Sequence, residues 1–186
     1  MKTFALLALL ALPCALYAAP ETRSLKGVTM PVYMDLAGVK LQLNGMGLRT
    51  KVVFKVYVGG LYLEKTSKDG MEIASSEQVK RMELVFLRSV SGADVAKAIA
   101  EGFAANAGDS LPALKERIDA FRKLIPDVKK GDKLTFTYLP GKGLEVEAGG
   151  KPAGVIQGKD FADALMRVWL GQKPADKDLK AGLLGL

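Results

Sequence analysis

Segments with alternating apolar residues and segments with helical periodicity occur in separate blocks along this chain, which limits its fold more than any other feature. The predicted strands are residues 28–34, 41–45, 51–63 and 80–90, then 134–138, 144–148 and 155–156. The predicted helices span about 92–106, 110–125 and 161–171, with a short last helix beginning near Pro174. This order argues for an α+β fold, in which helices cover one face of an antiparallel sheet.

Two glycines interrupt the long apolar segment 51–63. A pair such as Gly59-Gly60 inside a strand indicates a β-bulge or the close approach of another backbone. No internal repeat and no long linker divides the chain, so we expect residues 19–186 to form one domain.

Residues 1–18 have the layout of a secretory signal peptide. Lys2 provides a positive start, residues 4–12 are apolar, and small residues follow, so we predict cleavage after Ala18 and export to the periplasm. The apolar run is too short to cross a bilayer as a helix. A buried N-terminal helix and a lipid anchor at Cys14 are the alternatives. Cleavage lowers the formal net charge from +7 to +6, because Lys2 is the one charge that it removes.

The expected mature chain contains neither cysteine nor histidine. This excludes disulfides, zinc fingers, thiol catalysis, histidine-based triads and haem held by histidine, while haem ligation by Tyr or Met stays open. We expect no metal, no cofactor and a monomer. The basic residues are scattered, without the basic and aromatic stripe of nucleic-acid-binding proteins, so no nucleic-acid partner is expected. Peripheral contact with an anionic membrane and binding of acidic small molecules stay open.

Several stretches of the chain resemble the chalcone isomerase family. They are Gly-Met-Gly-Leu-Arg at 45–49, Phe-Lys-Val-Tyr-Val-Gly-Gly-Leu-Tyr-Leu-Glu at 54–64, Ser-Gly at 91–92 and Leu-Met-Arg-Val-Trp-Leu-Gly at 165–171. The resemblance covers about 27–185 and is strongest to the secreted bacterial branch. It implies an open-faced β-sandwich, with a large sheet covered by helices and a cleft between them. Because this fold hosts both enzymes and binding proteins, function has to be argued from the site.

The resemblance also places the catalytic positions of the plant enzymes on this chain, and most of them have changed. The arginine that binds the substrate phenolate falls at Arg49. The strand threonine falls at Tyr57, the helix tyrosine near Val95, the asparagine near Gly102 and the late threonine near Val168. Valine and glycine offer no hydroxyl or amide to hold a water or an oxyanion, so flavanone-forming activity is not expected and no catalytic residue is assigned.

The fatty-acid-binding members of the same fold are a closer match. They carry an arginine followed by a strand of the pattern Lys-Val-Tyr-x-x-Gly-x-Tyr, which here is residues 55–62. The resemblance implies that Arg49 and Tyr57 hold a carboxylate. The chemistry is suitable, because a guanidinium fork matches a carboxylate and a phenol adds a further donor.

Both members of this pair also have a purely structural interpretation. Arg49 can tie loop carbonyls together, and Tyr57 can be an ordinary core tyrosine. An unbroken strand would place the pair on one face with Lys51 and Lys55, and two lysines indicate a face toward solvent. A bulge or a loop before Phe54 is therefore needed to turn Tyr57 inward.

Tyr62, Arg88 and Trp169 are further candidate site residues. Arg88 lies near the end of a strand, facing either the cleft or solvent, and Trp169 belongs to a helical apolar stripe. The leading hypothesis is a non-catalytic periplasmic protein that binds a small amphipathic acid, such as a fatty acid or a similar lipid. The alternatives are an isomerase or intramolecular lyase that uses Arg49 on another substrate, and a scaffold that binds another envelope protein.

Overall fold

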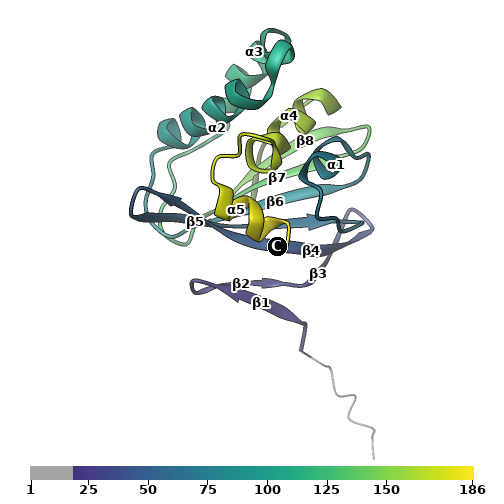
Figure 1. The fold of residues 1–186 in the computed structure, drawn as a ribbon, viewed down its shortest axis with the longest axis vertical. Coiled ribbons are helices and arrows are strands. Elements are labelled where there is room, and N and C mark those ends of the chain that lie inside the picture. Colours follow the sequence, from purple (N-terminus) through teal and green to yellow (C-terminus); the bar gives the residue numbers. More distant parts are fainter. Residues whose placement is uncertain (1–18) are drawn as a thin grey trace, which may run out of the picture.

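A seven-stranded antiparallel sheet forms the centre of the protein, and its neighbouring strands follow one another in sequence (Figure 1). The computed structural model describes residues 19–186, so the predicted signal peptide at 1–18 lies outside the described residues. The strands of this sheet are β3 (Tyr33–Leu36), β4 (Val39–Lys51), β5 (Phe54–Leu63), β6 (Lys80–Phe86), β7 (Lys133–Leu139), β8 (Gly143–Ala148) and β9 (Lys151–Ile156).

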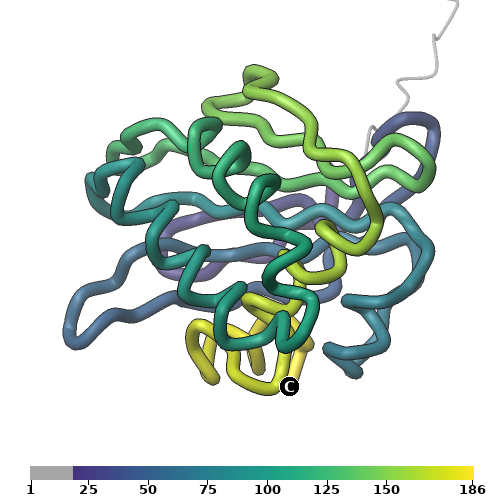
Figure 2. Tube along the Cα trace, turned by 90° about the horizontal axis from the view of Figure 1, so that it is seen from above, coloured from purple at the N-terminus to yellow at the C-terminus, as the bar shows by residue number. Residues whose placement is uncertain are grey.

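Helices cover one face of this sheet (Figures 1 and 2). They are α1 (Gly70–Ser75), α2 (Gly92–Asn106), α3 (Leu111–Arg122), α4 (Lys159–Leu170) and α5 (Lys177–Leu183), with a 3₁₀ turn at Gly108–Ser110. Phe103, Phe121, Phe136 and Trp169 are buried between the helices and the sheet. The predicted α+β fold, with an antiparallel sheet covered on one side, is confirmed. None of the described helices is both long and apolar enough to cross a membrane.

The opposite face of the sheet carries a small hairpin, β1 (Thr22–Leu25) with β2 (Val28–Pro31). Met30 of this hairpin packs over Gly60, where an added Cβ would lie 2.3 Å from the Met30 sulfur. The glycine pair therefore permits a close approach, but the approaching group is a side chain. The β-bulges that the glycines also suggested occur elsewhere, between Leu43 and Gly45 and between Arg49 and Thr50.

The predicted strand 51–63 proved to be the end of one strand and the whole of the next. Lys51 ends β4, Val52 and Val53 form a two-residue turn, and Phe54 begins β5. The prediction failed here because this turn contains no Gly, Pro, Asn or Asp, the residues that normally mark a turn. Helix α1 was also missed, although Asp69 caps it by accepting backbone N–H bonds from Met71 and Glu72.

Candidate ligand-binding cleft

A cleft opens where the start of α2 faces the end of β4, the start of β5 and the end of β6, and the last turn of α4 closes its inner side. The cleft has a volume of about 620 Å³, which includes the part open to solvent. The residues that line it are Arg49, Lys51, Tyr57, Asp94 and Trp169, with the apolar Val56, Leu84, Phe86, Val90, Val95, Ala98, Ile99, Val168 and Ala175. An apolar space with a few polar groups is typical of small-ligand sites.

Arg49 and Tyr57 lie directly opposite each other across the β4–β5 hairpin, as Cα partners in its register. The turn at Val52–Val53 reverses the chain between them, and a register shift between Arg49 and Thr50 alters the alternation of side chains. Both residues consequently line the cleft, while Lys55 is exposed. For Tyr57 to point inward, the sequence required a bulge or a loop before Phe54, and the turn at Val52–Val53 is such a break.

The Arg49 guanidinium is held by two neighbours at the polar end of the cleft. Its Nη1 donates to the carbonyl of Thr50 at 2.9 Å and to Oδ2 of Asp176 at 3.3 Å. Its Nε and Nη2 make no hydrogen bond within residues 19–186, and the side chain is 20% exposed. Arg49 therefore makes structural contacts, with Thr50 and Asp176, and its Nε and Nη2 still carry three N–H groups available to a ligand.

Asp176 is the N-cap of α5 and fixes the position of Arg49. One carboxylate oxygen accepts from the N–H groups of Asp178 and Leu179, and the other accepts from Thr50 N–H at 3.1 Å. Burial alone would raise the pKa of Asp176, but the N–H groups of Leu179 and Thr50 and the Arg49 guanidinium outweigh it and hold that pKa below its ordinary value. Asp176 is therefore an ionised partner for Arg49.

The Tyr57 phenol forms the deeper polar group of the cleft. It accepts a hydrogen bond from Nε1 of Trp169 at 3.0 Å, and its ring packs edge-on against Phe86 with 5.6 Å between centroids. Burial raises the pKa of Tyr57 to about 12, although the Trp169 bond and the charge of Arg49 act in the opposite direction. The phenol is therefore neutral at physiological pH, and its own proton makes no hydrogen bond within the described residues.

The inner side of the cleft is closed by a tight contact between α2 and α4. A Cβ added at Gly102 would lie 2.4 Å from Cγ1 of Val168, so glycine is required for this packing. Val95 and Val168 line the cleft itself. Val95, Gly102 and Val168, near which the resemblance places the helix tyrosine, asparagine and late threonine of the plant enzymes, thus contribute apolar surface and close packing here.

The further candidate site residues from the sequence lie in three different places. Trp169 lines the cleft and bonds to Tyr57. Tyr62 lies on the opposite face of the sheet, where its hydroxyl donates to the carbonyl of Pro31 at 2.9 Å. Arg88 is exposed, with its guanidinium 4.6 Å from the centre of the Phe54 ring.

Asp176 was missed as a site residue by sequence reasoning. Its position between Pro174 and a short helix is a signal from which an N-cap could have been predicted, but nothing in the sequence connects it with Arg49, 127 residues away. Lys51 and Asp94 at the mouth of the cleft were also missed as lining residues.

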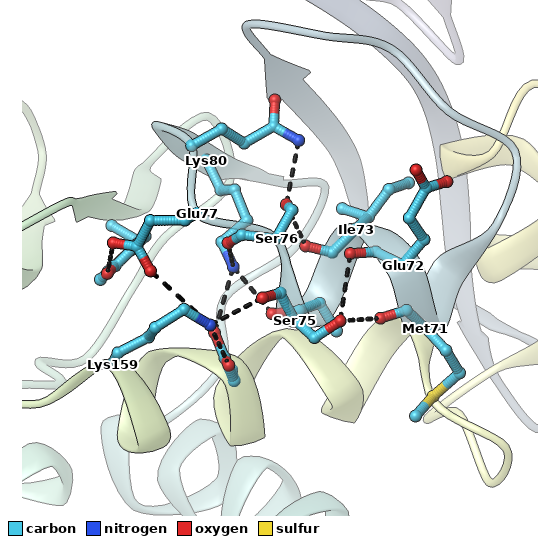
Figure 3. Close-up of polar contacts among 12 residues, drawn as sticks. Met71, Glu72, Ile73, Ser75, Ser76, Glu77, Lys80 and Lys159 are labelled. Carbon is cyan, nitrogen blue, oxygen red and sulfur yellow. Dashed lines mark hydrogen bonds and ion pairs between the residues drawn. The ribbon is translucent and has the colours of Figure 1, made fainter.

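A fully buried lysine lies outside the cleft, beneath α1 (Figure 3). The Lys80 ammonium donates to the carbonyls of Ala74 and Ser76 and to Oδ1 of Asp163, at 2.7, 3.0 and 3.2 Å. Burial lowers the pKa of Lys80, and the pairing with Asp163 opposes this. All three donors are used, so Lys80 ties the end of α1 to α4 and has no proton left to offer a ligand. Within residues 19–186 no group of three or more acidic side chains is placed to hold a metal ion.

Known proteins share the fold and the sequence pattern of this chain. A search of the curated proteins found no matching relative. Among solved structures, the crystal structure of a fatty-acid binding protein from Arabidopsis thaliana superimposes with a TM-score of 0.71, over 88% of this chain and 96% of that one, at 15% sequence identity. At that identity the likeness shows a common fold. The sequence itself matches the family described as chalcone isomerase-like over residues 22–185, which confirms the resemblance. The chain belongs to the chalcone isomerase-like family.

Proposed function

We propose that this protein is a non-catalytic, periplasmic binding protein for a small amphipathic acid such as a fatty acid, and that Arg49 and Tyr57 hold the acid group. The observation that carries the proposal is the direct pairing of these two residues across the β4–β5 hairpin, at the polar end of an apolar cleft. The periplasmic location rests on the signal-like composition of residues 1–18.

A carboxylate placed between these residues would find suitable donors. The three remaining N–H groups of Arg49, on Nε and Nη2, and the phenol proton of Tyr57 can bind its oxygens, while Trp169 keeps the phenol oriented. Hydrogen bonds to a charged group contribute about 1.5–3 kcal/mol each. Because Arg49 and Tyr57 are already held by protein neighbours, little rotamer entropy is lost when the acid binds.

The apolar part of the ligand would lie against the remaining walls. Leu84, Phe86, Val95, Ile99 and Val168 supply carbon surface, and each methylene group removed from water contributes about 0.8 kcal/mol. The fatty-acid binding protein that shares the fold supports the same class of ligand.

The isomerase alternative lacks comparable support. Among the residues described as lining the cleft, Tyr57 is the only one with a hydroxyl, and none has a side-chain amide. A proton-transfer and oxyanion network of the plant type therefore has no counterpart at these positions.

Native mass spectrometry of protein purified from cells, followed by fatty-acid titration, tests the proposal. Trp169 is the only tryptophan of the chain and lines the cleft, so its fluorescence reports binding. We expect Arg49→Ala to weaken binding roughly tenfold to a hundredfold, and Arg88→Ala, the matched control at an exposed arginine, to leave it unchanged. The proposal fails if the wild type neither carries nor binds an acid and Arg49→Ala changes no affinity. Turnover of chalcones or other enones that Arg49→Ala abolishes would favour the enzyme instead.

A further inference from the structure

The β4–β5 hairpin ends in an apolar tip, formed by Val52, Val53 and Phe54. These side chains are 88%, 77% and 56% exposed, which makes the tip the densest group of exposed large apolar side chains in residues 19–186. Figure 2 shows the blue hairpin projecting beyond the body of the protein. Scattered exposed apolar residues are ordinary, but three in succession at a projecting turn indicate a contact surface.

The turn chemistry indicates that this tip does not serve the fold. Val52 has a φ of +58°, a conformation that β-branched residues rarely adopt and that turns of this kind normally give to glycine. Three other two-residue turns join neighbouring strands of the described chain, and none has a β-branched residue at either position. They are Lys26-Gly27, Ala37-Gly38 and Gly149-Gly150. The valine at the first position of the β4–β5 turn therefore strains the backbone, and neither valine adds to the core.

Basic side chains surround the apolar tip. Lys51 precedes it and Lys55 follows it, and both are exposed. The guanidinium of Arg88 lies over the Phe54 ring, 4.6 Å from its centre. An apolar projection with a basic collar matches the interface of an anionic bilayer, in which the apolar groups enter the acyl boundary and the cations meet the lipid headgroups. Long basic side chains reach the headgroup level easily.

The apolar tip lies next to the mouth of the cleft. Lys51 lines the cleft and is followed directly by Val52, and Arg49 is two residues before Lys51. A hairpin inserted by its tip would therefore bring the polar end of the cleft to the bilayer surface. Amphipathic acids are held at that surface, with the acid group among the headgroups.

We propose that the apolar tip docks this protein on an anionic lipid bilayer, and that the cleft exchanges its amphipathic acid with that membrane. The exchange rests on the proposed function, whereas the docking rests on the tip and its basic collar alone. A second protein copy or another protein is less suited to the tip, because the tip projects as a narrow wedge and all three collar charges are positive.

Vesicle flotation tests the docking. The probes are phosphatidylcholine vesicles with and without phosphatidylglycerol, and the full exported chain should float with the anionic vesicles only. Val52→Gly/Val53→Asn should reduce the bound fraction at least about tenfold, because two valine side chains no longer enter the lipid. Lys55→Gln/Arg88→Gln should weaken binding roughly fivefold for each charge removed, and added salt should have the same effect.

The matched control is Val155→Asn, which replaces a 49%-exposed valine on β9 and should float like the wild type. Thermal melting should show Val52→Gly/Val53→Asn to be at least as stable as the wild type, since glycine suits the positive φ. Unfolding therefore cannot account for lost flotation. The docking proposal is overturned if the wild type does not float, if the turn variant floats equally well, or if the variant changes only the oligomeric state.

Fatty-acid titration without vesicles separates the two proposals. The turn variant should bind free acid as the wild type does, because neither valine lines the cleft. Normal acid binding by a wild type that does not float would overturn the docking and leave the proposed function intact. Flotation by a wild type that binds no acid would support the docking and overturn both the function and the exchange.

Discussion

Arg49 and Asp176 meet at the polar end of the cleft, with 3.3 Å between Nη1 and Oδ2, although 127 residues separate them in the chain. The same carboxylate caps α5 and accepts the Thr50 N–H, so it ties the start of α5 to the end of β4. Asp176 thus fixes the guanidinium in place, but it also sets a negative charge beside the group proposed to bind a carboxylate. By holding Arg49 in place Asp176 favours binding of the acid, and by its negative charge it disfavours binding of the same acid.

Asp176→Asn shows which of these two effects is larger. Asparagine caps a helix about as well as aspartate, so α5 should be retained, while the competing charge and the oxygen that accepts from Arg49 and Thr50 are both removed. We expect fatty-acid affinity, followed by Trp169 fluorescence, to rise about threefold to tenfold. Asp178→Asn, an exposed acid in the first turn of the same helix, should leave the affinity unchanged. A weaker affinity in Asp176→Asn would show instead that positioning of Arg49 dominates.

Asp176 should also contribute to the acid dependence of stability. Its pKa in the folded protein is lowered from 3.8, so the folded state favours the ionised form. The associated stability is fully present above 3.8 and is lost as the pH falls from 3.8 through the lower, folded pKa. Urea unfolding across this range should therefore give a shallower acid limb for Asp176→Asn than for the wild type. Identical pH profiles would contradict the assignment.

Tyr57→Phe removes the second donor proposed for the acid group. We expect affinity to fall about tenfold, and stability to fall by about 1–3 kcal/mol because the buried Trp169 N–H loses its acceptor. In the wild type, the raised pKa of Tyr57 contributes stability that is fully present below pH 10 and is lost as the pH rises through about 12. This alkaline loss should be smaller in Tyr57→Phe, when unfolding is followed by circular dichroism. Tyr62→Phe, on the opposite face of the sheet, should leave acid affinity unchanged.

Much of this architecture could be predicted from sequence because periodicity is a local property. The segment around Val95, Ile99 and Phe103 has a helical pattern, the segment around Leu134, Phe136 and Tyr138 has an alternating one, and all of these residues are buried. The β4–β5 turn could not be predicted, because its two valines have strand propensity. The chain reverses there because β4 pairs with β5, and that pairing is not visible in the local sequence.

Only part of the candidate site could be predicted, because sequence patterns reveal local contacts and not contacts between distant elements. Arg49 and Tyr57 were identified through a family pattern within one hairpin. Their partners Asp176 and Trp169 come from other elements, 127 and 112 residues away, and no local signal links them. Contacts between distant elements depend on the packing of α4 and α5 against the sheet, which spacing along the chain does not reveal.

Gly102→Ala tests the closed inner side of the cleft. The new methyl group would lie 2.4 Å from Cγ1 of Val168, so we expect a loss of about 1–3 kcal/mol in the free energy of unfolding from overpacking. Val168→Ala alone should also destabilise, by about 2 kcal/mol, because it leaves a cavity. The double variant should lose less than the sum of the two, since alanine at 168 makes room for alanine at 102. Additive losses in urea unfolding would show that the two sites do not touch.

The buried ammonium of Lys80 gives the last prediction (Figure 3). Lys80→Met leaves Asp163 with Lys159 as its remaining lysine partner, and it leaves the Ala74 and Ser76 carbonyls without the Lys80 donor. We expect a loss of about 3–5 kcal/mol in the free energy of unfolding, because one member of a buried pair is removed. Lys80→Met/Asp163→Leu should recover part of that loss, since both charges then leave the interior. Urea unfolding at neutral pH measures both, and equal losses in the single and double variants would mean that the carbonyls, not the ion pair, account for the cost. Fatty-acid affinity should stay unchanged in every variant that remains folded, because Lys80 does not line the cleft.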